Sequence, residues 1–326
     1  MKRNFKKRII QWGIAGSCFG YILLTLWQQR AYLQTIVRID PLYLLMILLL
    51  LVCYYFLHAY RFRIILQKCS NRYLPYREWF RIFILGLFLN NFIPQMGNVY
   101  RSILLKRDHD LPITGYVSSY VSFAWMDLCI NMILAGTVVS VTNPALRFSG
   151  MKVSVTVLLF GGAFAVMVLP VVIFFLGYWF DRKFHRRIRL YDKLSGIVKT
   201  TLYNLKDLKY VAAVVALGII VFFEMSTIFL ICFRSLGLHS TWSTMALFYA
   251  LYKVSIYFNI TPGNIGVREL AYGLLSEKLH FGMTEGLLVA AVFRVFVYIA
   301  LFGFAIPMGG IDLLRRKGKY HPPEKT

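Results

Sequence analysis

The sequence predicts an all-α polytopic membrane protein, with about six full spans plus two re-entrant helical hairpins that form an inverted repeat. Three observations lead to this prediction. Hydrophobic residues make up 58% of the 326 residues, which is typical of a chain with several helices in lipid. Two apolar segments are interrupted by similar motifs of Asn, Pro, Gly and Arg. Stretches rich in Lys and Arg alternate with poor ones between the apolar runs.

We expect a single transmembrane domain over residues 1–326. Its parts are a first repeat at about 41–142, a linker span and basic cytoplasmic stretch at 153–210, a second repeat at about 211–311 and a basic tail at 312–326. The longest hydrophilic stretch, 181–210, has 30 residues, which is too few for a second folded domain.

Full spans are predicted where an apolar run reaches the roughly 20 residues that a helix needs to cross the bilayer core. These runs are Ile9–Trp27, Pro41–Tyr60, Tyr116–Thr142, Val153–Phe180, Val211–Phe233 and Glu285–Ile311. The first run follows the basic start MKRNFKKR, as in a signal peptide. Its length and the lack of an evident small-residue cleavage site favour a retained helix instead.

Two further segments, about Phe80–Lys106 and Ser243–Leu279, contain the interrupting motifs. The motifs read Asn91-Phe-Ile-Pro94-Gln-Met-Gly97-Asn98-Val-Tyr-Arg101 and Asn259-Ile-Thr261-Pro262-Gly263-Asn-Ile-Gly266-Val-Arg268-Glu269. Proline suits the first turn of a new helix, and Thr261 is placed to cap one that begins at Pro262. A helix broken at membrane depth is tolerated where it is buried in protein or lines a wet cavity. We therefore expect the breaks to form a site.

The spacing of charged residues also indicates a repeat. Arg101 lies 26 residues before Asp127, and Arg268 lies 26 residues before Arg294. The repeat is degenerate, because the spacing from Pro to Gly differs by one residue between the two motifs. Interrupted hydrophobic segments in corresponding halves of a chain point to a transporter-type binding site.

The distribution of Lys and Arg predicts that both motif segments are hairpins. The stretches 1–8, 61–81, 181–210 and 312–326 hold 5, 6, 9 and 5 of these residues, whereas 28–40, 143–152 and 234–243 hold 2, 2 and 1. Re-entrant hairpins place all the rich stretches in the cytoplasm, with both termini, whereas single crossings would place the richest stretch outside. The two hairpins then enter from opposite faces. The stretch 181–210 is either an amphipathic helix along the headgroups or a basic loop that sets the topology.

Several charges fall at or near hydrocarbon depth, where each costs about 2.5–3.5 kcal/mol at a helix centre. They are Asp127, Glu224, Lys253, Arg268, Glu269 and Arg294, with Arg101 just after the first break. One interpretation is a set of structural ion pairs, such as Asp127 with Arg294 across the pseudo-two-fold axis of the repeat. The other is a binding site in which the excess of cations, beside two half-helix N-termini, binds an anion. Arginine binds phosphate well, and the abundant phosphate of a membrane belongs to lipid headgroups.

Composition argues against other classes of protein. The net charge of +23 comes from short basic blocks that flank apolar runs, so it indicates anionic lipid and not nucleic acid. The five cysteines have no CxxC spacing and the six histidines show no ligand-like pairing, so we expect no metal and no cofactor. No Walker A sequence is present.

The segments FLNNFIPQMGNVYRSILL and YFNITPGNIGVRELAYG resemble signatures of the lysylphosphatidylglycerol synthetase/flippase family, and hydropathy is compatible over about 9–315. Family members with the full architecture make an aminoacylated phospholipid in a soluble C-terminal domain and translocate it with the membrane domain. The resemblance implies only the translocating half, because this chain ends at Thr326 after a short basic tail. It marks Pro94, Gly97, Arg101, Thr261, Pro262, Gly263, Gly266, Arg268 and Glu269 as translocation-site candidates. Asn98 stands where some relatives are expected to have an acidic residue.

We therefore expect a flippase-like lipid translocase, not an enzyme, in a bacterial or archaeal cytoplasmic membrane. Its partners would be lipids with an anionic headgroup (phospholipid, glycolipid or polyprenyl-linked) and a protein of envelope biosynthesis. The substrate-binding candidates are Asn91, Pro94, Gly97, Arg101, Asp127, Lys253, Asn259, Thr261, Pro262, Gly263, Gly266, Arg268, Glu269 and Arg294. One alternative is a membrane glycosyl- or phosphotransferase, for which the first outer loop offers only Asp40, with no acidic neighbour. The other is an accessory subunit whose charges are purely structural.

Overall fold

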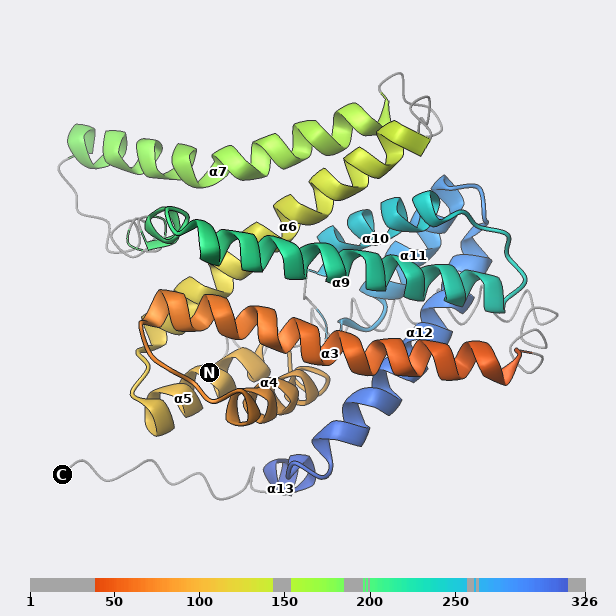
Figure 1. Cartoon of the computed structure of the whole chain (residues 1–326), viewed down its shortest axis with the longest axis horizontal. Helices are drawn as coiled ribbons and strands as arrows, with labels where there is room; N and C mark the ends of the chain where they lie inside the picture. Colours follow the sequence, from red (N-terminus) through yellow and green to blue (C-terminus); the bar gives the residue numbers. More distant parts are fainter. Residues whose placement is uncertain are drawn as a thin grey trace, which may run out of the picture.

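The computed structural model describes residues 39–142, 154–184, 196, 198, 200–256, 261 and 264–315. Within these residues the protein is all-α (Figure 1). Its helices are α3 (Pro41–Ser70), α4 (Tyr76–Asn90), α5 (Met96–His109), α6 (Ile113–Thr142), α7 (Val155–Phe184), α9 (Leu208–Ser235), α10 (Trp242–Ile256), α11 (Val267–Lys278), α12 (Met283–Ala305) and α13 (Gly310–Arg315). Five of them, α3, α6, α7, α9 and α12, are long and apolar enough to cross a membrane. The prediction of an all-α polytopic membrane protein is thus confirmed, while the predicted span Ile9–Trp27 and most of 181–210 lie outside the described residues.

The same order of helices occurs twice in the chain. A long helix, two short helices and a second long helix have 30, 15, 14 and 30 residues in α3–α6 and 28, 15, 12 and 23 residues in α9–α12. The two short helices pack on each other in both sets, so each pair is a helical hairpin. We call these the first hairpin (α4–α5) and the second hairpin (α10–α11).

The packing of the two sets follows one pattern. The first hairpin packs on α12 through α4, and the second packs on α6 through α10. Likewise α5 packs on α6 as α11 packs on α12, and α3 packs on α4 as α9 packs on α10. Each set therefore holds the other set's hairpin against its own last helix.

Helices α3 and α9 form the centre of this arrangement and run antiparallel, side by side (Figure 1). Lys68, near the end of α3, donates to Asp207 at the start of α9, with 2.5 Å between Nζ and Oδ2. The Lys68 ammonium and the backbone N–H of Tyr210 hold the pKa of Asp207 below its ordinary value. Because each hairpin follows the end of its long helix, the two hairpins start at opposite ends of the α3–α9 pair.

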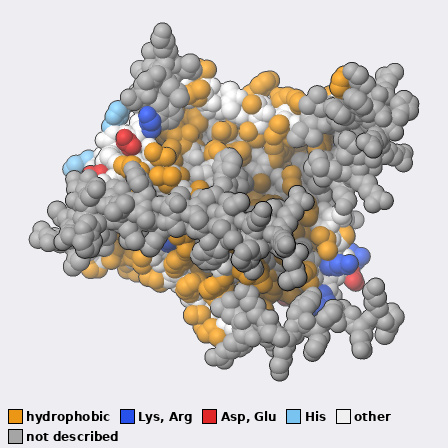
Figure 2. Space-filling model, turned by 180° about the vertical axis from the view of Figure 1, so that it is seen from behind, with side chains coloured by type: hydrophobic (Ala, Val, Ile, Leu, Met, Phe, Trp, Pro, Cys, Tyr) orange, Lys and Arg blue, Asp and Glu red, His pale blue; other side chains and the backbone are white. Residues whose placement is uncertain are grey.

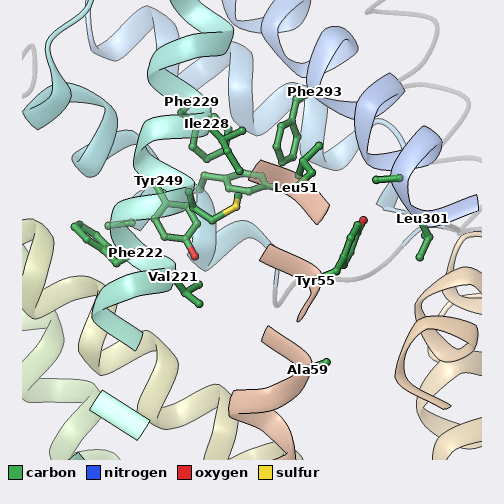
Figure 3. Close-up of a cluster of buried hydrophobic side chains, with 14 of the residues drawn as sticks. Leu51, Tyr55, Ala59, Val221, Phe222, Ile228, Phe229, Tyr249, Phe293 and Leu301 are labelled. Atoms are coloured by element: carbon green, nitrogen blue, oxygen red, sulfur yellow. The ribbon is translucent and has the colours of Figure 1, made fainter. Parts of the chain in front are cut away.

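Aromatic and aliphatic side chains from both sets form one core (Figure 3). Leu51 and Tyr55 of α3, Phe229 of α9 and Phe293 of α12 all belong to this core. The rings of Phe229 and Phe293 lie 5.2 Å apart between centroids. Buried rings of this size contribute both burial of apolar area and favourable edge contacts. The core therefore holds the two sets together.

The outer surface is also apolar, as lipid requires. Figure 2 shows hydrophobic side chains over much of the visible described surface, with most of the visible charged side chains toward its ends. Helix α7 packs on α6 and exposes large apolar side chains, including Phe164 and Phe175, along its length. An exposed apolar surface of this extent is expected of a protein whose solvent is hydrocarbon.

Two predicted span boundaries are wrong. Helix α3 continues beyond Tyr60 to Ser70, because its buried face continues with Phe62 and Ile65 after the first basic residues. Helix α12 ends at Ala305 instead of Ile311, and a turn with Gly309 at φ +93° separates it from α13. Asp40, the candidate for outer-loop catalysis, caps α3: its Oδ1 accepts from Leu42 N–H at 2.8 Å.

The first hairpin closes through a contact between two glycines, and this contact can be tested. A Cβ on Gly97 would lie 1.9 Å from the carbonyl oxygen of Gly86. Because the Gly86 oxygen belongs to a helix backbone and cannot rotate away, Gly97→Ala should destabilise the protein by about 1–3 kcal/mol or more. Thermal unfolding in detergent measures the effect. The control is Gly303→Ala in α12, where a Cβ meets nothing within 4 Å, and which should leave stability unchanged or slightly raised.

Candidate functional site

The first break is a tight turn between α4 and α5. Its backbone reverses at Gln95, which has a left-handed φ of 63° and forms the N-cap of α5. Pro94 therefore lies in the turn, before the helix. Asn90 holds the two arms together, because its Oδ1 accepts from Gly97 N–H at 2.7 Å.

The second break differs from its prediction, in which Thr261 caps a helix that begins at Pro262. Helix α11 begins at Val267, with Gly266 at φ 85° as its N-cap. Thr261 is buried and its hydroxyl donates to the carbonyl of Ile265 at 2.8 Å, so it does not cap the helix. Glu269 performs that role instead, since its Oε2 accepts from Gly266 N–H at 2.7 Å. Asn259, Pro262 and Gly263 lie outside the described residues.

Both breaks open onto one cavity of about 270 Å³, which we call the central cavity. The first hairpin contributes Asn90, Asn91, Gln95, Asn98 and Arg101. The second contributes Lys253 and Arg268, with Asn264 from the segment between its arms. Helix α3 adds Tyr54, Tyr55 and His58, and α6 adds Asp127. Of the predicted site residues, Asn91, Arg101, Asp127, Lys253 and Arg268 thus meet around one space.

Asp127 is fully buried and joins three helices. Its Oδ1 lies 2.5 Å from Nη1 of Arg61 on α3, and its Oδ2 lies 2.9 Å from Nζ of Lys253 on α10. The predicted pair of Asp127 with Arg294 is therefore wrong. The prediction missed Arg61, which was counted in a cytoplasmic basic stretch but is completely buried in the extended part of α3.

Arg294 pairs with Glu269 instead, with 2.6 Å between Nη2 and Oε1. Glu269 thus joins the start of α11 to α12. Its ion pair is with Arg294 and not with its neighbour Arg268, and it is not among the residues that line the central cavity. The pair lies at a second, much smaller pocket beside the cavity, lined also by Tyr252, Tyr272 and Tyr298. Exchanging Asp127 and Arg294 should not restore what each single change removes, because each residue would face a partner of its own charge.

The ion pair of Glu269 can be separated from its capping role. Glu269→Gln keeps an oxygen that accepts from Gly266 N–H but removes the negative charge beside Arg294. We expect a loss of about 1.5–3 kcal/mol of stability, the range for a charged hydrogen bond. The matched control is Glu277→Gln on the same helix, where the side chain is exposed and the change should be small. Equal melting of both variants in detergent would contradict the pairing.

Arg101, which is buried, and Arg268, which is half-buried, differ from the buried cations Arg61 and Lys253. Arg101 is 3% exposed, donates to the carbonyl of Phe83 at 2.8 Å and lies over the Phe83 ring. Arg268 donates to the hydroxyl of Tyr252. Among the described residues, no carboxylate forms an ion pair with either arginine. The lining of the central cavity therefore holds three cations and, among described residues, one carboxylate.

Three other residues singled out from the sequence, Gly97, Gly266 and Glu224, do not line the central cavity. Gly97 allows the close approach of α4 and α5, and Gly266 supplies the positive φ that starts α11. Glu224 lies on α9 beside the Cys53 thiol of α3, away from the lining of the central cavity. Within the described residues, no three His, Cys, Asp or Glu side chains are grouped so as to hold a metal ion.

Sequence reasoning missed several lining residues. Two of them carry buried polar atoms that have no hydrogen-bond partner in the described structure: His58 Nδ1 and Asn264 Oδ1. A signal for His58 was present, because it precedes Arg61 by one helical turn on α3 and so faces the same side. Asn264 lies inside the second motif, between Gly263 and Gly266, but was not among the predicted site residues.

The chain matches the model of one protein family, described as the lysylphosphatidylglycerol synthase TM region, over residues 9–305. The chain belongs to this family. The match covers nearly the whole sequence, including both hairpins and all the residues that line the central cavity. Comparison with curated proteins and with solved structures gave no significant match.

Membership of the lysylphosphatidylglycerol synthase TM family, together with the apolar helices, makes this a multi-pass membrane protein. It also connects the protein to lipid metabolism or envelope biogenesis. The resemblance stated from the two motifs is thereby confirmed.

Proposed function

We propose that the protein is a translocase that carries a lipid with an anionic headgroup across the membrane, with the headgroup in the central cavity. The observation that carries this proposal is a pair of arginines, Arg101, which is buried, and Arg268, which is half-buried. They come from the two hairpins, line the same cavity and have no ion pair with a described carboxylate. On this proposal the protein acts without chemistry of its own, as a transporter.

Charge compensation is the physical reason. A buried cation without a counterion is costly, and the cost is relieved when an anion enters. Arginine offers a planar fork of donors that matches the oxygens of phosphate. Because the cavity lies among membrane-spanning helices, a phospholipid headgroup is the anion at highest local concentration.

The geometry of the hairpins favours alternating access. An arm of 15 residues is about 22 Å long, which is shorter than the roughly 30 Å of a bilayer core. Each hairpin would therefore enter the membrane and return to the face it came from. Since α3 and α9 are antiparallel, the two hairpins would enter from opposite faces, as in inverted-repeat transporters.

Cysteine labelling tests this topology. Tyr73 in the loop before the first hairpin and His239 in the loop before the second are both exposed. In a background without native cysteines, Tyr73→Cys should react with an impermeant maleimide only from the cytoplasm and His239→Cys only from outside. Both termini should lie in the cytoplasm of a bacterial or archaeal cell. Labelling of both positions from one face would contradict the opposed hairpins.

Transport is tested with purified protein in liposomes that contain phosphatidylglycerol with a fluorescent acyl chain. Dithionite quenches only the outer leaflet in protein-free liposomes, and we expect it to quench the lipid of both leaflets when the protein is present. Quenching equal to that of protein-free liposomes, for every anionic lipid tried, would contradict the proposal. A new covalent lipid product in the same liposomes would favour the transferase alternative.

A further inference from the structure

Among the described residues, the central cavity offers no free carboxylate to an amine. The carboxylate that lines it among the described residues is that of Asp127, and both of its oxygens are taken, Oδ1 by Arg61 and Oδ2 by Lys253. The other charged lining residues are Arg101, Lys253 and Arg268. An ammonium group on a headgroup would meet three like charges and no available counterion, which is a strong element of selection against it.

The uncharged polar lining is made of amides. Asn90, Asn91, Gln95 and Asn98 come from the first break, and Asn264 comes from the second. An amide carries both donors and acceptors, as a hydroxyl group does, so amides suit ligands rich in hydroxyl groups. They surround the cavity together with Arg101 and Arg268, which suit phosphate.

Besides the charges and amides of the lining, Asn264 gives an independent indication of a ligand. Its side chain belongs to a residue that is 5% exposed, it lines the cavity, and its Oδ1 has no hydrogen-bond partner within the described structure. A buried acceptor without a partner is costly, and a ligand hydroxyl supplies what is missing. The cavity volume of about 270 Å³ greatly exceeds the roughly 30 Å³ that one water occupies in the liquid. A headgroup, and not only a single ion, therefore fits.

We infer that the cavity selects a phosphate headgroup that bears hydroxyl groups and no amine, such as phosphoglycerol or a phosphorylated sugar. This inference rests on the proposed lipid translocase and names the class of its substrate. The phosphate lies between Arg101 and Arg268, and the hydroxyl groups contact the amides, including Asn264. Zwitterionic and aminoacylated headgroups are rejected through their positive charge.

The test compares lipids with the same short acyl chains. Binding of dihexanoyl phosphatidylglycerol, phosphatidylethanolamine and phosphatidic acid to the purified full chain is measured by calorimetry in detergent. We expect phosphatidylglycerol to bind at least about tenfold more tightly than phosphatidylethanolamine, and more tightly than phosphatidic acid, which lacks the hydroxyl groups. Equal binding of the ethanolamine and glycerol lipids overturns the inference but leaves the translocase intact.

A variant isolates the hydroxyl contact. Asn264 has a left-handed φ of 55°, which glycine adopts readily, so Asn264→Gly should fold normally. It should abolish the preference for phosphatidylglycerol over phosphatidic acid and leave the affinity for phosphatidic acid unchanged. A preserved preference overturns the role of the amide.

A soluble ligand separates the two proposals. Glycerol 3-phosphate carries the same phosphate and hydroxyl groups without acyl chains, and we expect it to bind more weakly than the lipid. If it binds as tightly as phosphatidylglycerol, the protein recognises a free phosphate ester and the lipid translocase is wrong, while the selection for hydroxyl groups stands. If none of these compounds binds, both the inference and the proposed function fail.

Discussion

Asp127→Asn should destabilise the protein by about 3–5 kcal/mol, the cost of removing one partner from a buried ion pair. Asp127 is completely buried and forms ion pairs with both Arg61 and Lys253. The amide keeps the size of the side chain, so the loss comes from charge and not from a cavity. Because the three residues belong to α6, α3 and α10, their separation should loosen the contact between the two sets of helices.

A double variant checks this explanation. Asp127→Asn together with Lys253→Met again leaves one more cation than carboxylate in the cluster, as in the native protein. Thermal unfolding in detergent should show the double variant to be more stable than Asp127→Asn alone. If Asp127→Asn unfolds at the native temperature, the carboxylate does not hold the two cations.

Arg101→Gln and Arg268→Gln should each slow lipid translocation roughly 10- to 100-fold, because a hydrogen bond to a charged group contributes about 1.5–3 kcal/mol. The arginines lie on different hairpins, so loss of either one should be sufficient. The rate of dithionite quenching in liposomes measures the effect. Lysine at either position should restore it only in part, since lysine keeps the charge but lacks the planar fork.

Stability separates binding from folding in these variants. Neither arginine has an ion pair with a described carboxylate, so their replacement should lower the unfolding temperature far less than Asp127→Asn does. The matched control is Arg234→Gln, an exposed position near the end of α9. It should translocate lipid at the native rate. A native rate in Arg101→Gln and Arg268→Gln as well would leave the central cavity without its proposed role.

Hydropathy and charge were sufficient to predict the helices and the convergence of the two motif segments. The long helices follow from apolar runs, and Arg101 and Arg268 line one cavity as the repeat implies. Local signals were less reliable. Thr261 was expected to cap a helix that begins at Pro262, but Gly266, whose φ is positive, sets where α11 begins. A backbone reversal of this kind depends on tertiary packing, which propensity does not contain.

The partners of the buried charges could not be predicted from sequence. Equivalent positions in a repeat, such as Asp127 and Arg294, lie in related places, but the nearest opposite charge decides which pair forms. For Asp127, one such partner is Arg61, which the sequence places in a basic stretch because the apolar run ends at Tyr60. Only the continued burial of one face of α3 shows that the arginine is inside.

Helix α12 connects the two half-sites mechanically. Arg268 is the neighbour of Glu269, whose carboxylate ties the start of α11 to Arg294 on α12. Helix α12 also packs against α4 of the first hairpin. Arg81 of α4 donates to the carbonyl of Met308, just beyond the end of α12. A tilt of α12 that draws one hairpin inward must therefore pull on the other. On the proposed function, α12 would act as a lever that carries the effect of ligand capture at one hairpin to the other hairpin.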